Sequence, residues 1–408
     1  MRAYLRRWGW LWAALLLALL LRLPDMATVG HEYDLQLLWR WGYDARVNGL
    51  FGVYSRVPSV NYPPVLVSLL ALASTLEQLG ASPYAPLKIP PITAELLMIA
   101  AVGGWLRQEN GRWRLAIVLL LAFNPGLIGT SALWGQGEAL QTLFLLLALL
   151  ALNHDQPRLA WGCFALGLLT KFQAVALLPL LVLLTLRRYG WRELLLGTAL
   201  CGALLTLALW PFVAASGWEA ALRHYLTAFN PAPTTANAFN IWYWITPPPP
   251  GIFLTIPHYN TRDSDLFWQN ITYRQFGLGL LSLYTLLICA AMWRGYRQKR
   301  EFLWAAALYL GFFMLSTRIH ERYLYPALVF AIVGMAQLRW LWIPALGLTL
   351  TYAYNIVHTL DVAMIWLALP LPWLLPQELL QAMLALNLFL LVGLAFLLFV
   401  PDAQPTQA

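Results

Sequence analysis

Long apolar runs, separated by short clusters of arginine, limit what this 408-residue chain can fold into. Hydrophobic residues make up 60% of the sequence and charged residues only 11%. That balance is typical of a polytopic membrane protein and not of a soluble globule. The runs and their charged flanks predict an all-α fold with about twelve transmembrane helices, in a single transmembrane domain over residues 1–408.

The basic residues gather in short loops between the runs. About fifteen of the 26 Lys and Arg fall in six clusters: Arg2/Arg6/Arg7, Arg107/Arg112/Arg114, Arg158, Arg187/Arg188/Arg192, Arg294/Arg297/Lys299/Arg300 and Arg339. The positive-inside rule places all of these clusters, and both termini, in the cytoplasm. The net charge of +8 is then a consequence of topology and does not indicate nucleic-acid binding.

Two stretches decide whether this topology is consistent. The run from Val65 to Leu79 has only about 15 apolar residues, so we expect an interfacial or re-entrant helix there. The run from Leu159 to Leu186 would form one helix about 42 Å long, and a single crossing would put the next arginine cluster outside. We therefore expect two short helices that meet near Lys171, which would lie recessed below the outer surface.

Five polar segments then share the outer face. They are residues 24–87, residues 134–138, the corner at Lys171, residues 215–274 and the cluster Arg318–Tyr323. In lipid, the three charges of the last cluster would cost on the order of 8–10 kcal/mol, at about 2.5–3.5 kcal/mol each. The cluster therefore faces water or a polar cavity, and we expect the loops 24–87 and 215–274 to form an active-site cavity with it.

The first outer loop carries the acidic candidates. Asp34 opens an expected surface helix, where a carboxylate either caps the helix or, if it faces a cavity that contains cations, acts as a general base. Glu32 and Asp44 are further candidates, here assigned to substrate binding. Asp34 and Asp44 could also hold a divalent cation, but no ligand cluster has a diagnostic spacing, so we assign no metal site and no certain cofactor.

The cationic candidates lie in two other segments. Arg318 and Arg322 are four residues apart and would share one face of a helix, where Glu321 could neutralise them. Alternatively they bind an anion, most naturally a phosphate, with His320 as a further donor. Lys171 either extends to the surface or adds a recessed cation.

Other polar and aromatic residues leave alternatives open. Gln136 and Glu138, at the outer end of a span, could hydrogen-bond a sugar or cap the next helix. Residues Trp242–Trp244 could stack on a sugar or belong to an interfacial aromatic belt. Glu95 lies within an apolar run, and we expect it to be paired inside the bundle.

A carboxylate facing several cations at the outer side suits glycosyl transfer. The carboxylate would deprotonate an acceptor hydroxyl, which attacks a sugar carbon as a phosphate departs, and the cations would stabilise the charge on the leaving group. Because nucleotide sugars are cytoplasmic, the donor on the outer side would be a sugar carried on a lipid phosphate.

The order of several short motifs carries a family resemblance. They are Asp34 to Trp41, Tyr62-Pro63-Pro64, Gln136, Lys171 with Gln173 and Pro179, and His320-Glu321-Arg322. This set, spread over about residues 30 to 340, resembles the GT-C glycosyltransferases that use polyprenyl-phosphate sugars. Within them it is most similar to the dolichyl-phosphate-glucose glucosyltransferases of N-glycan assembly and their bacterial relatives.

The resemblance implies an inverting hexosyltransferase, with Asp34 as base and the His-Glu-basic segment near the donor phosphate. It implies glucose or mannose as the sugar and a lipid-linked or envelope glycan as the acceptor. Tyr62, Gln136 and Gln173 would contact substrate. The enzyme would lie in a bacterial plasma membrane, or in the endoplasmic reticulum if eukaryotic, with its site on the outer or lumenal face. The alternative is a transporter or lipid flippase, for which we would expect repeated halves and mid-membrane charges that the sequence does not show.

Overall fold

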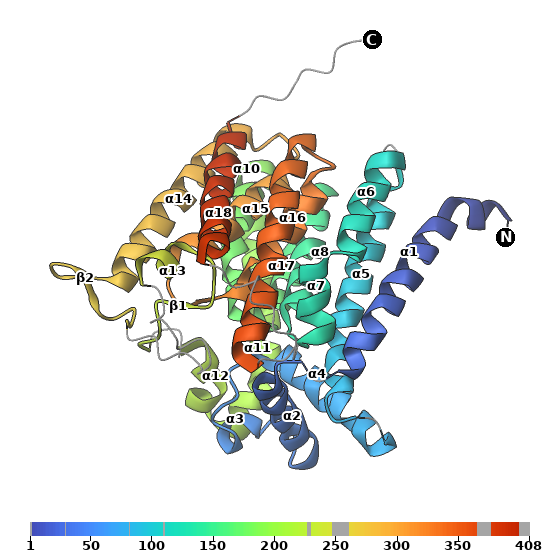
Figure 1. Ribbon diagram of the computed structural model, residues 1–408, viewed down its shortest axis with the longest axis vertical. Coiled ribbons are helices and arrows are strands. Elements are labelled where there is room, and N and C mark those ends of the chain that lie inside the picture. Colours follow the sequence, from blue (N-terminus) through green and yellow to red (C-terminus); the bar gives the residue numbers. More distant parts are fainter. Residues whose placement is uncertain are drawn as a thin grey trace, which may run out of the picture.

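The computed structural model describes residues 2–28, 30–80, 82–108, 111–226, 230–246, 261–364 and 377–399. Helices form nearly all of the regular structure in these residues (Figure 1). Two small strand pairs accompany them: β1 (Thr235–Ala236) runs parallel to β4 (Ile319–His320), and β2 (Leu266–Trp268) runs antiparallel to β3 (Ile271–Thr272). The predicted all-α class is therefore confirmed.

Seven segments of the described chain are helical, long and apolar enough to cross a membrane. They are α1 (Arg2–Ala27), η2 (Ala85–Lys88) with α5 (Ile89–Trp105), α6 (Gly111–Ala122) with α7 (Pro125–Ile128) and η4 (Gly129–Leu133), η5 (Phe172–Leu177) with α10 (Leu178–Tyr189), α11 (Trp191–Ser216), α14 (Tyr273–Gly295) and α18 (Gln377–Leu397). The predicted number of about twelve spans is not confirmed, because several apolar runs fold into helices too short to cross.

The remaining described helices are mostly short. They are α2 (Glu32–Val47), α3 (Val53–Arg56), α4 (Pro64–Ser74), α8 (Glu138–Asn153), α9 (Pro157–Leu168), α12 (Trp218–Leu226), α13 (Ile241–Ile245), α15 (Glu301–Leu315), α16 (Tyr325–Gly334) and α17 (Trp342–Met364), with the 3-10 turns η1 (Thr75–Leu79), η3 (Leu106–Gln108), η7 (Glu321–Leu324) and η8 (Arg339–Leu341). A helix of 15 residues such as α15 is about 22 Å long, whereas the hydrocarbon core of a bilayer is about 30 Å thick.

The arginine-rich loops meet at one end of the molecule, which we call the basic end. Arg158 Nη2 lies 2.7 Å from Glu193 Oε1, Arg188 pairs with Glu301, and Lys299 Nζ donates to Asn153 O at 3.1 Å. These contacts join the loops α8–α9, α10–α11 and α14–α15, which lie at the top of Figure 1. The prediction that these loops share one side is confirmed; their cytoplasmic location stays a prediction.

At the opposite end, α2, α3 and α12 lie together beside α4 (Figure 1), and we call this the loop end. Ser216 Oγ donates to Phe51 O at 2.9 Å, so the end of α11 meets the first loop there. Residues 65–79 form the 11-residue α4 and the turn η1 rather than a full span. This confirms the short helix expected for that run.

Helices α9 and α10 form a hairpin that enters from the basic end and turns inside the molecule. Both outer ends lie at the basic end, where Tyr189 OH donates to Asp155 Oδ1 at 2.9 Å. The turn lies at residues 169–171, and Leu169 O accepts there from Val65 N at 3.0 Å. The prediction of two short helices meeting near Lys171 is confirmed, and Lys171 is 2% exposed at the tip.

Helices α15 and α16 form a second hairpin of the same kind. Gln337 Nε2, just beyond α16, donates to Glu301 Oε2 at 2.7 Å, so both outer ends lie at the basic end. Pro326 occupies the first turn of α16, a position where its missing N–H and fixed φ favour a helix start. The tip of this hairpin, residues 316–324, is the polar cluster that interrupts the apolar sequence.

The second hairpin lies in the core and packs against α14, α17 and α18. Almost every residue of α15 and all of α16 are buried, whereas α11 and α14 have only a few buried residues each. The exposed side chains of the outer helices are large and apolar, for example Leu207, Leu283 and Phe396. A surface of this kind fits contact with lipid. The tips of the two hairpins are then polar segments recessed within an otherwise apolar molecule.

Candidate active site

Helix α2 holds Asp34 in its first turn. His31 is the N-cap residue, and its Nδ1 accepts from the backbone N of Asp34 at 3.3 Å. A carboxylate in the first turn is favoured by the helix dipole. The expected helix beginning near Asp34 is thus confirmed, its position along the membrane surface stays a prediction, and the cap itself is the histidine three residues earlier.

The Asp34 carboxylate contacts the segment between η4 and α8. Its Oδ2 accepts from Trp134 Nε1 and from Gln136 Nε2, both at 2.9 Å. Its Oδ1 lies 3.9 Å from His31 Nδ1, and the side chain is 20% exposed. Two donors from a distant segment therefore orient a carboxylate that solvent or a substrate can still reach.

Close backbone packing holds this segment against the first loop. A Cβ on Gly30 would lie only 1.8 Å from Leu133 O, so glycine is required where these two segments of the backbone touch. Gly135 has a φ of +76°, which favours glycine, and the next N–H, of Gln136, donates to Thr130 O at 3.0 Å. These contacts place the Gln136 side chain beside Asp34.

Glu95 holds two segments of the site in place through hydrogen bonds inside the helix bundle. It lies 2.7 Å from Arg22 and accepts from Ser131 Oγ and Tyr325 OH, each at 2.7 Å. Ser131 precedes the Trp134–Glu138 segment, and Tyr325 follows the tip of the second hairpin. The prediction that Glu95 is paired inside the bundle is confirmed, and its partners link the two segments.

Gln136 continues the hydrogen-bond chain to the first loop. Its Oε1 accepts from Tyr62 OH at 2.9 Å while its Nε2 donates to Asp34. Burial raises the pKa of Tyr62, so its hydroxyl stays a donor. Tyr62, Gln136 and Asp34 therefore form one connected group, and Gln136 orients the carboxylate rather than capping α8.

The cations meet over Glu138, the first residue of α8. Lys171 Nζ donates to Glu138 Oε1, and Arg322 Nε lies 3.4 Å from the same oxygen. Arg322 Nη1 also donates to Glu321 Oε1 at 2.8 Å. Lys171 does not extend to the surface, because its Nζ lies 4.8 Å from the centre of the Tyr62 ring inside the site.

Trp134 joins the carboxylate to the cations. Its Nε1 donates to Asp34, and the Arg322 guanidinium lies 5.3 Å from its ring centre. The imidazole of His31 stacks on the same indole at 5.1 Å between ring centres, with an interplanar angle of 2°. The Trp134 side chain thus contacts both the general-base candidate, Asp34, and a cation, Arg322.

Arg318 and Arg322 do not share a helical face, and that prediction is wrong. Arg318 has a φ of +68°, its N–H donates to Thr234 O at 2.8 Å, and the next two residues pair with β1. The strand pairing extends the chain between the two arginines. Arg318 Nε consequently lies 3.0 Å from Asp263 Oδ2, whereas Arg322 points to Glu138.

His320 lies half-buried at the hairpin tip. Its ring centre is 5.3 Å from that of Tyr323. Burial, reinforced by Arg322 and Lys171, holds the pKa of His320 well below its usual 6.5, so the imidazole is neutral near pH 7. Burial also raises the pKa of Glu321 at the same tip.

Lowering the pH from 7.5 to 5.5 is expected to destabilise the protein through His320. Because the pKa of His320 is lower in the folded than in the unfolded state, the unfolded chain takes up a proton first, and stability falls as the pH drops below 6.5. The loss at pH 5.5 is about 1 kcal/mol. The apparent melting temperature in detergent should fall less for His320→Gln than for the unchanged protein; equal slopes would assign the pH dependence to another group.

Three candidates lie away from this group. Glu32 Oε1 accepts from Gln36 Nε2 at 3.1 Å on the exposed side of α2, and Asp44 lies 2.9 Å from Arg56. Gln173 has its backbone carbonyl, not its side chain, bonded to Tyr309 OH. Asp34 and Asp44 therefore make separate contacts, and no three His, Cys, Asp or Glu side chains of the described chain come together as metal ligands.

The sequence suggested no role for four side chains that contact the site residues. They are His31, Trp134, Asp263 and Tyr323. A histidine just before an expected helix start and a tryptophan beside Gln136 were available signals, but Asp263 is recognisable only once its loop is folded.

Trp242 neither stacks on a sugar nor belongs to an interfacial aromatic belt: it is fully buried, and its Nε1 donates to Leu315 O at 3.0 Å. Residues 227–229 and 247–260 of the expected cavity loop 215–274 lie outside the described residues.

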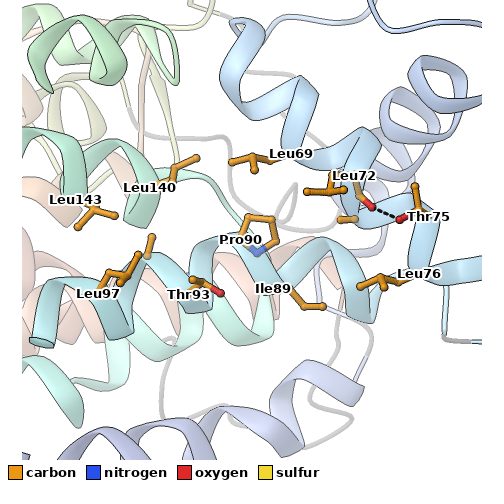
Figure 2. A pocket seen from close by; sticks show the side chains of 12 residues that line it. Leu69, Leu72, Thr75, Leu76, Ile89, Pro90, Thr93, Leu97, Leu140 and Leu143 are labelled. Carbon is orange, nitrogen blue, oxygen red and sulfur yellow. Dashed lines mark hydrogen bonds between the residues drawn. The ribbon is translucent and has the colours of Figure 1, made fainter. Parts of the chain in front are cut away.

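An apolar groove lies beside the site, between α4 with η1 and α5 with α8 (Figure 2). It encloses about 430 Å³, and ten of its twelve lining residues are apolar: Leu69, Leu72, Ala73, Leu76, Ile89, Pro90, Ala94, Leu97, Leu140 and Leu143. Its rim is open, since Leu72 is 64% and Leu97 is 52% exposed. Leu140 and Leu143 belong to α8, the helix that begins with Glu138.

Comparison with known proteins adds a family assignment. The profile of glycosyltransferase family 87 matches residues 61–317, more than half of the chain. The matched region includes Tyr62, Gln136, Glu138 and Lys171, while Asp34 and Arg322 lie outside it. Among curated proteins, no sequence matches the chain.

Proposed function

The chain belongs to glycosyltransferase family 87 and is therefore a membrane glycosyltransferase, and from this premise we propose that it transfers a hexose, with inversion, from a polyprenyl-phosphate donor. The proposed acceptor is a lipid-linked or envelope glycan, and the proposed site faces the outer or lumenal side, between the loops 24–87 and 215–274. The observation that carries the proposal is the convergence of Asp34 and Arg322 on Trp134.

In the proposed reaction Asp34 is the general base. A hydroxyl of the acceptor gives its proton to Asp34 as its oxygen forms a bond to the anomeric carbon of the sugar. Trp134 and Gln136 hold the carboxylate in one orientation, so little reorganisation is needed at this step. Glu32 and Asp44, at the positions described above, have no part in the proposed step.

The bond between the anomeric carbon and the phosphate oxygen breaks on the other side, and its electron pair passes to the phosphate. Lys171 and Arg322 stabilise that charge in a recessed site, where electrostatic effects are stronger than in water. Glu138 keeps the two cations together before the donor binds. Neutral His320 is placed to donate a hydrogen bond to the same phosphate.

The apolar groove supports a lipid-linked donor rather than a soluble one. A polyprenyl chain in the groove of Figure 2 would lie along α8 and lead towards Glu138 and Lys171. The near absence of polar groups on its walls suits a hydrocarbon chain, because a soluble nucleotide would leave its own polar groups unpaired there. The same groove would not help to bind a nucleotide sugar.

Incubation of the purified protein with radiolabelled polyprenyl-phosphate-mannose or -glucose, with a lipid extract as acceptor, tests the proposal. We expect a labelled product from one of the two donors, with the opposite anomeric configuration. Product from a nucleotide sugar but from neither lipid donor would overturn the proposed donor while leaving the glycosyltransferase assignment intact. A retained configuration would overturn the single-base mechanism.

Filling the groove should weaken use of long-chain donors selectively. Thr93 lines the groove with an exposed side chain, so Thr93→Trp adds bulk there without overpacking the core. Because each buried CH₂ contributes about 0.8 kcal/mol, displacing part of the chain should raise KM for a long-chain donor by about tenfold or more. Initial rates with a long-chain and a very short-chain donor measure the effect, and the short-chain donor should be used normally.

Thr198→Trp is the matched control, because Thr198 is an exposed threonine on α11, away from the groove. It should leave KM unchanged for both donors. An equal rise of KM for long and short donors in Thr93→Trp would contradict a chain-binding groove.

A further inference from the structure

A second pocket lies at the basic end, far along the helices from the site just described. It encloses about 380 Å³ and lies beside α10 and the loop that follows α14. Four cations line it, Arg187, Arg188, Arg297 and Lys299, against one carboxylate, Asp155. The lining is therefore strongly positive, and none of the proposed catalytic groups reaches it.

Only one of these cations, among the described residues, is neutralised by a carboxylate. Arg188 pairs with Glu301 and donates to two backbone carbonyls. Arg187, Arg297 and Lys299 form no ion pair in the described part of the chain, and Asp155 accepts from Tyr189 OH at 2.9 Å. Three positive charges thus face the pocket without an anionic partner.

Arg187 is held in place although it is not neutralised. Its guanidinium carbon lies 3.9 Å from the ring centre of Trp293 and 4.3 Å from that of Tyr296. Its Nε is buried and has no hydrogen-bond partner in the described residues. Two aromatic rings therefore pre-organise a cation whose remaining donors are available to a ligand.

The surroundings of this pocket fit a position at the level of lipid headgroups. Trp293 is 50% and Trp191 is 60% exposed, and tryptophans of this kind gather at membrane interfaces. Leu286 and Leu283 continue the exposed apolar face of α14 away from the pocket. A lipid with its anionic headgroup in this pocket could therefore lay its hydrocarbon chains along α14.

We propose that this pocket binds the phosphate of an anionic phospholipid, such as phosphatidylglycerol, with Arg187, Arg297 and Lys299 around the phosphate and the acyl chains along α14. Basic pockets between helices are known to suit anionic headgroups. The site is separate from sugar transfer, so the proposal does not depend on the donor or the acceptor.

Native mass spectrometry of the purified protein, mixed with phosphatidylglycerol or phosphatidylcholine at equal concentrations, tests the proposal. We expect the phosphatidylglycerol-bound fraction to exceed the phosphatidylcholine-bound fraction by about fivefold or more. Arg187→Gln should remove most of that difference. Arg297→Gln, an exposed change with no buried contact, should reduce it too, so the test does not depend on the folding of one variant.

Arg192→Gln is the matched control, because Arg192 is an exposed arginine at the same end but does not line the pocket. It should bind phosphatidylglycerol like the unchanged protein. Equal binding of the two lipids, or equal losses in all three variants, would overturn the site. Competition by inorganic phosphate or glycerol phosphate at the concentration of the lipid would show that the pocket takes a free anion, which would overturn the lipid assignment.

Discussion

Asp34→Asn is expected to reduce the rate of sugar transfer by about 100- to 10,000-fold, the usual contribution of a general base. The asparagine keeps an oxygen that can accept from Trp134 Nε1 and Gln136 Nε2, so the helix start and the hydrogen-bond chain through Tyr62 should persist. Only the capacity to take the acceptor proton is lost. Initial rates at saturating donor, with donor affinity measured separately, separate this effect from weaker binding, which should change little.

Asp44→Asn is the matched control for this prediction. Asp44 lies on the same helix, ten residues later, and is paired with Arg56. It was an acidic candidate by sequence, yet its contacts are separate from those of Asp34, so its loss should leave transfer nearly unchanged. Normal turnover in Asp34→Asn, or an equal loss in both variants, would rule out Asp34 as the base.

The recessed position of Lys171 could be predicted from the sequence because it follows from charge and length. A single helix over Leu159–Leu186 would put Arg187 and Arg188 on the wrong side, and two half-length helices remove that conflict. The second hairpin, α15 with α16, was not predicted as a hairpin, although it has the same form. Its two apolar runs fold into helices of 15 and 10 residues, which is one reason why the predicted number of about twelve crossings is not confirmed.

The separation of Arg318 from Arg322 could not be predicted from spacing. Their four-residue interval suggests a helix, but β4 pairs with β1, about 85 residues earlier in the chain. Strand pairing between distant segments leaves no local pattern in so short a stretch. The partner of Arg318, Asp263, comes from a third segment, so the destination of that side chain depends on the folded loop 261–274.

The contact of Glu138 with both Lys171 and Arg322 could not be predicted from the sequence either. Gln136 and Glu138 were treated alike, as sugar ligands or caps, because they stand two residues apart at a span end. In the structure Gln136 points to Asp34 and Glu138 to Lys171 and Arg322. Gly137, the N-cap residue of α8, separates the two, so Gln136 lies before the helix and Glu138 in its first turn.

Arg322→Gln is expected to lower kcat/KM for the sugar donor by about 100- to 1,000-fold, the scale found when one group that stabilises a developing negative charge is removed. Arg322 contacts Glu138 and Glu321 and lies over Trp134, so its charge is close to both the proposed phosphate position and the base. Arg322→Lys should recover part of the loss, because it restores the charge without the planar fork. Steady-state kinetics over a range of donor concentrations measure both variants.

Arg318→Gln separates an anion-binding role from a structural one. The two arginines belong to one hairpin tip, but Arg318 pairs with Asp263, on the side of the loop 261–274. Its loss should therefore lower kcat/KM less than tenfold. Removing one member of the buried group at Arg322 costs about 3–5 kcal/mol of stability, so both variants must first show cooperative melting in detergent. If Arg318→Gln and Arg322→Gln, both folded, reduce donor use equally, the phosphate lies between the two arginines and the assignment to Lys171 and Arg322 is wrong.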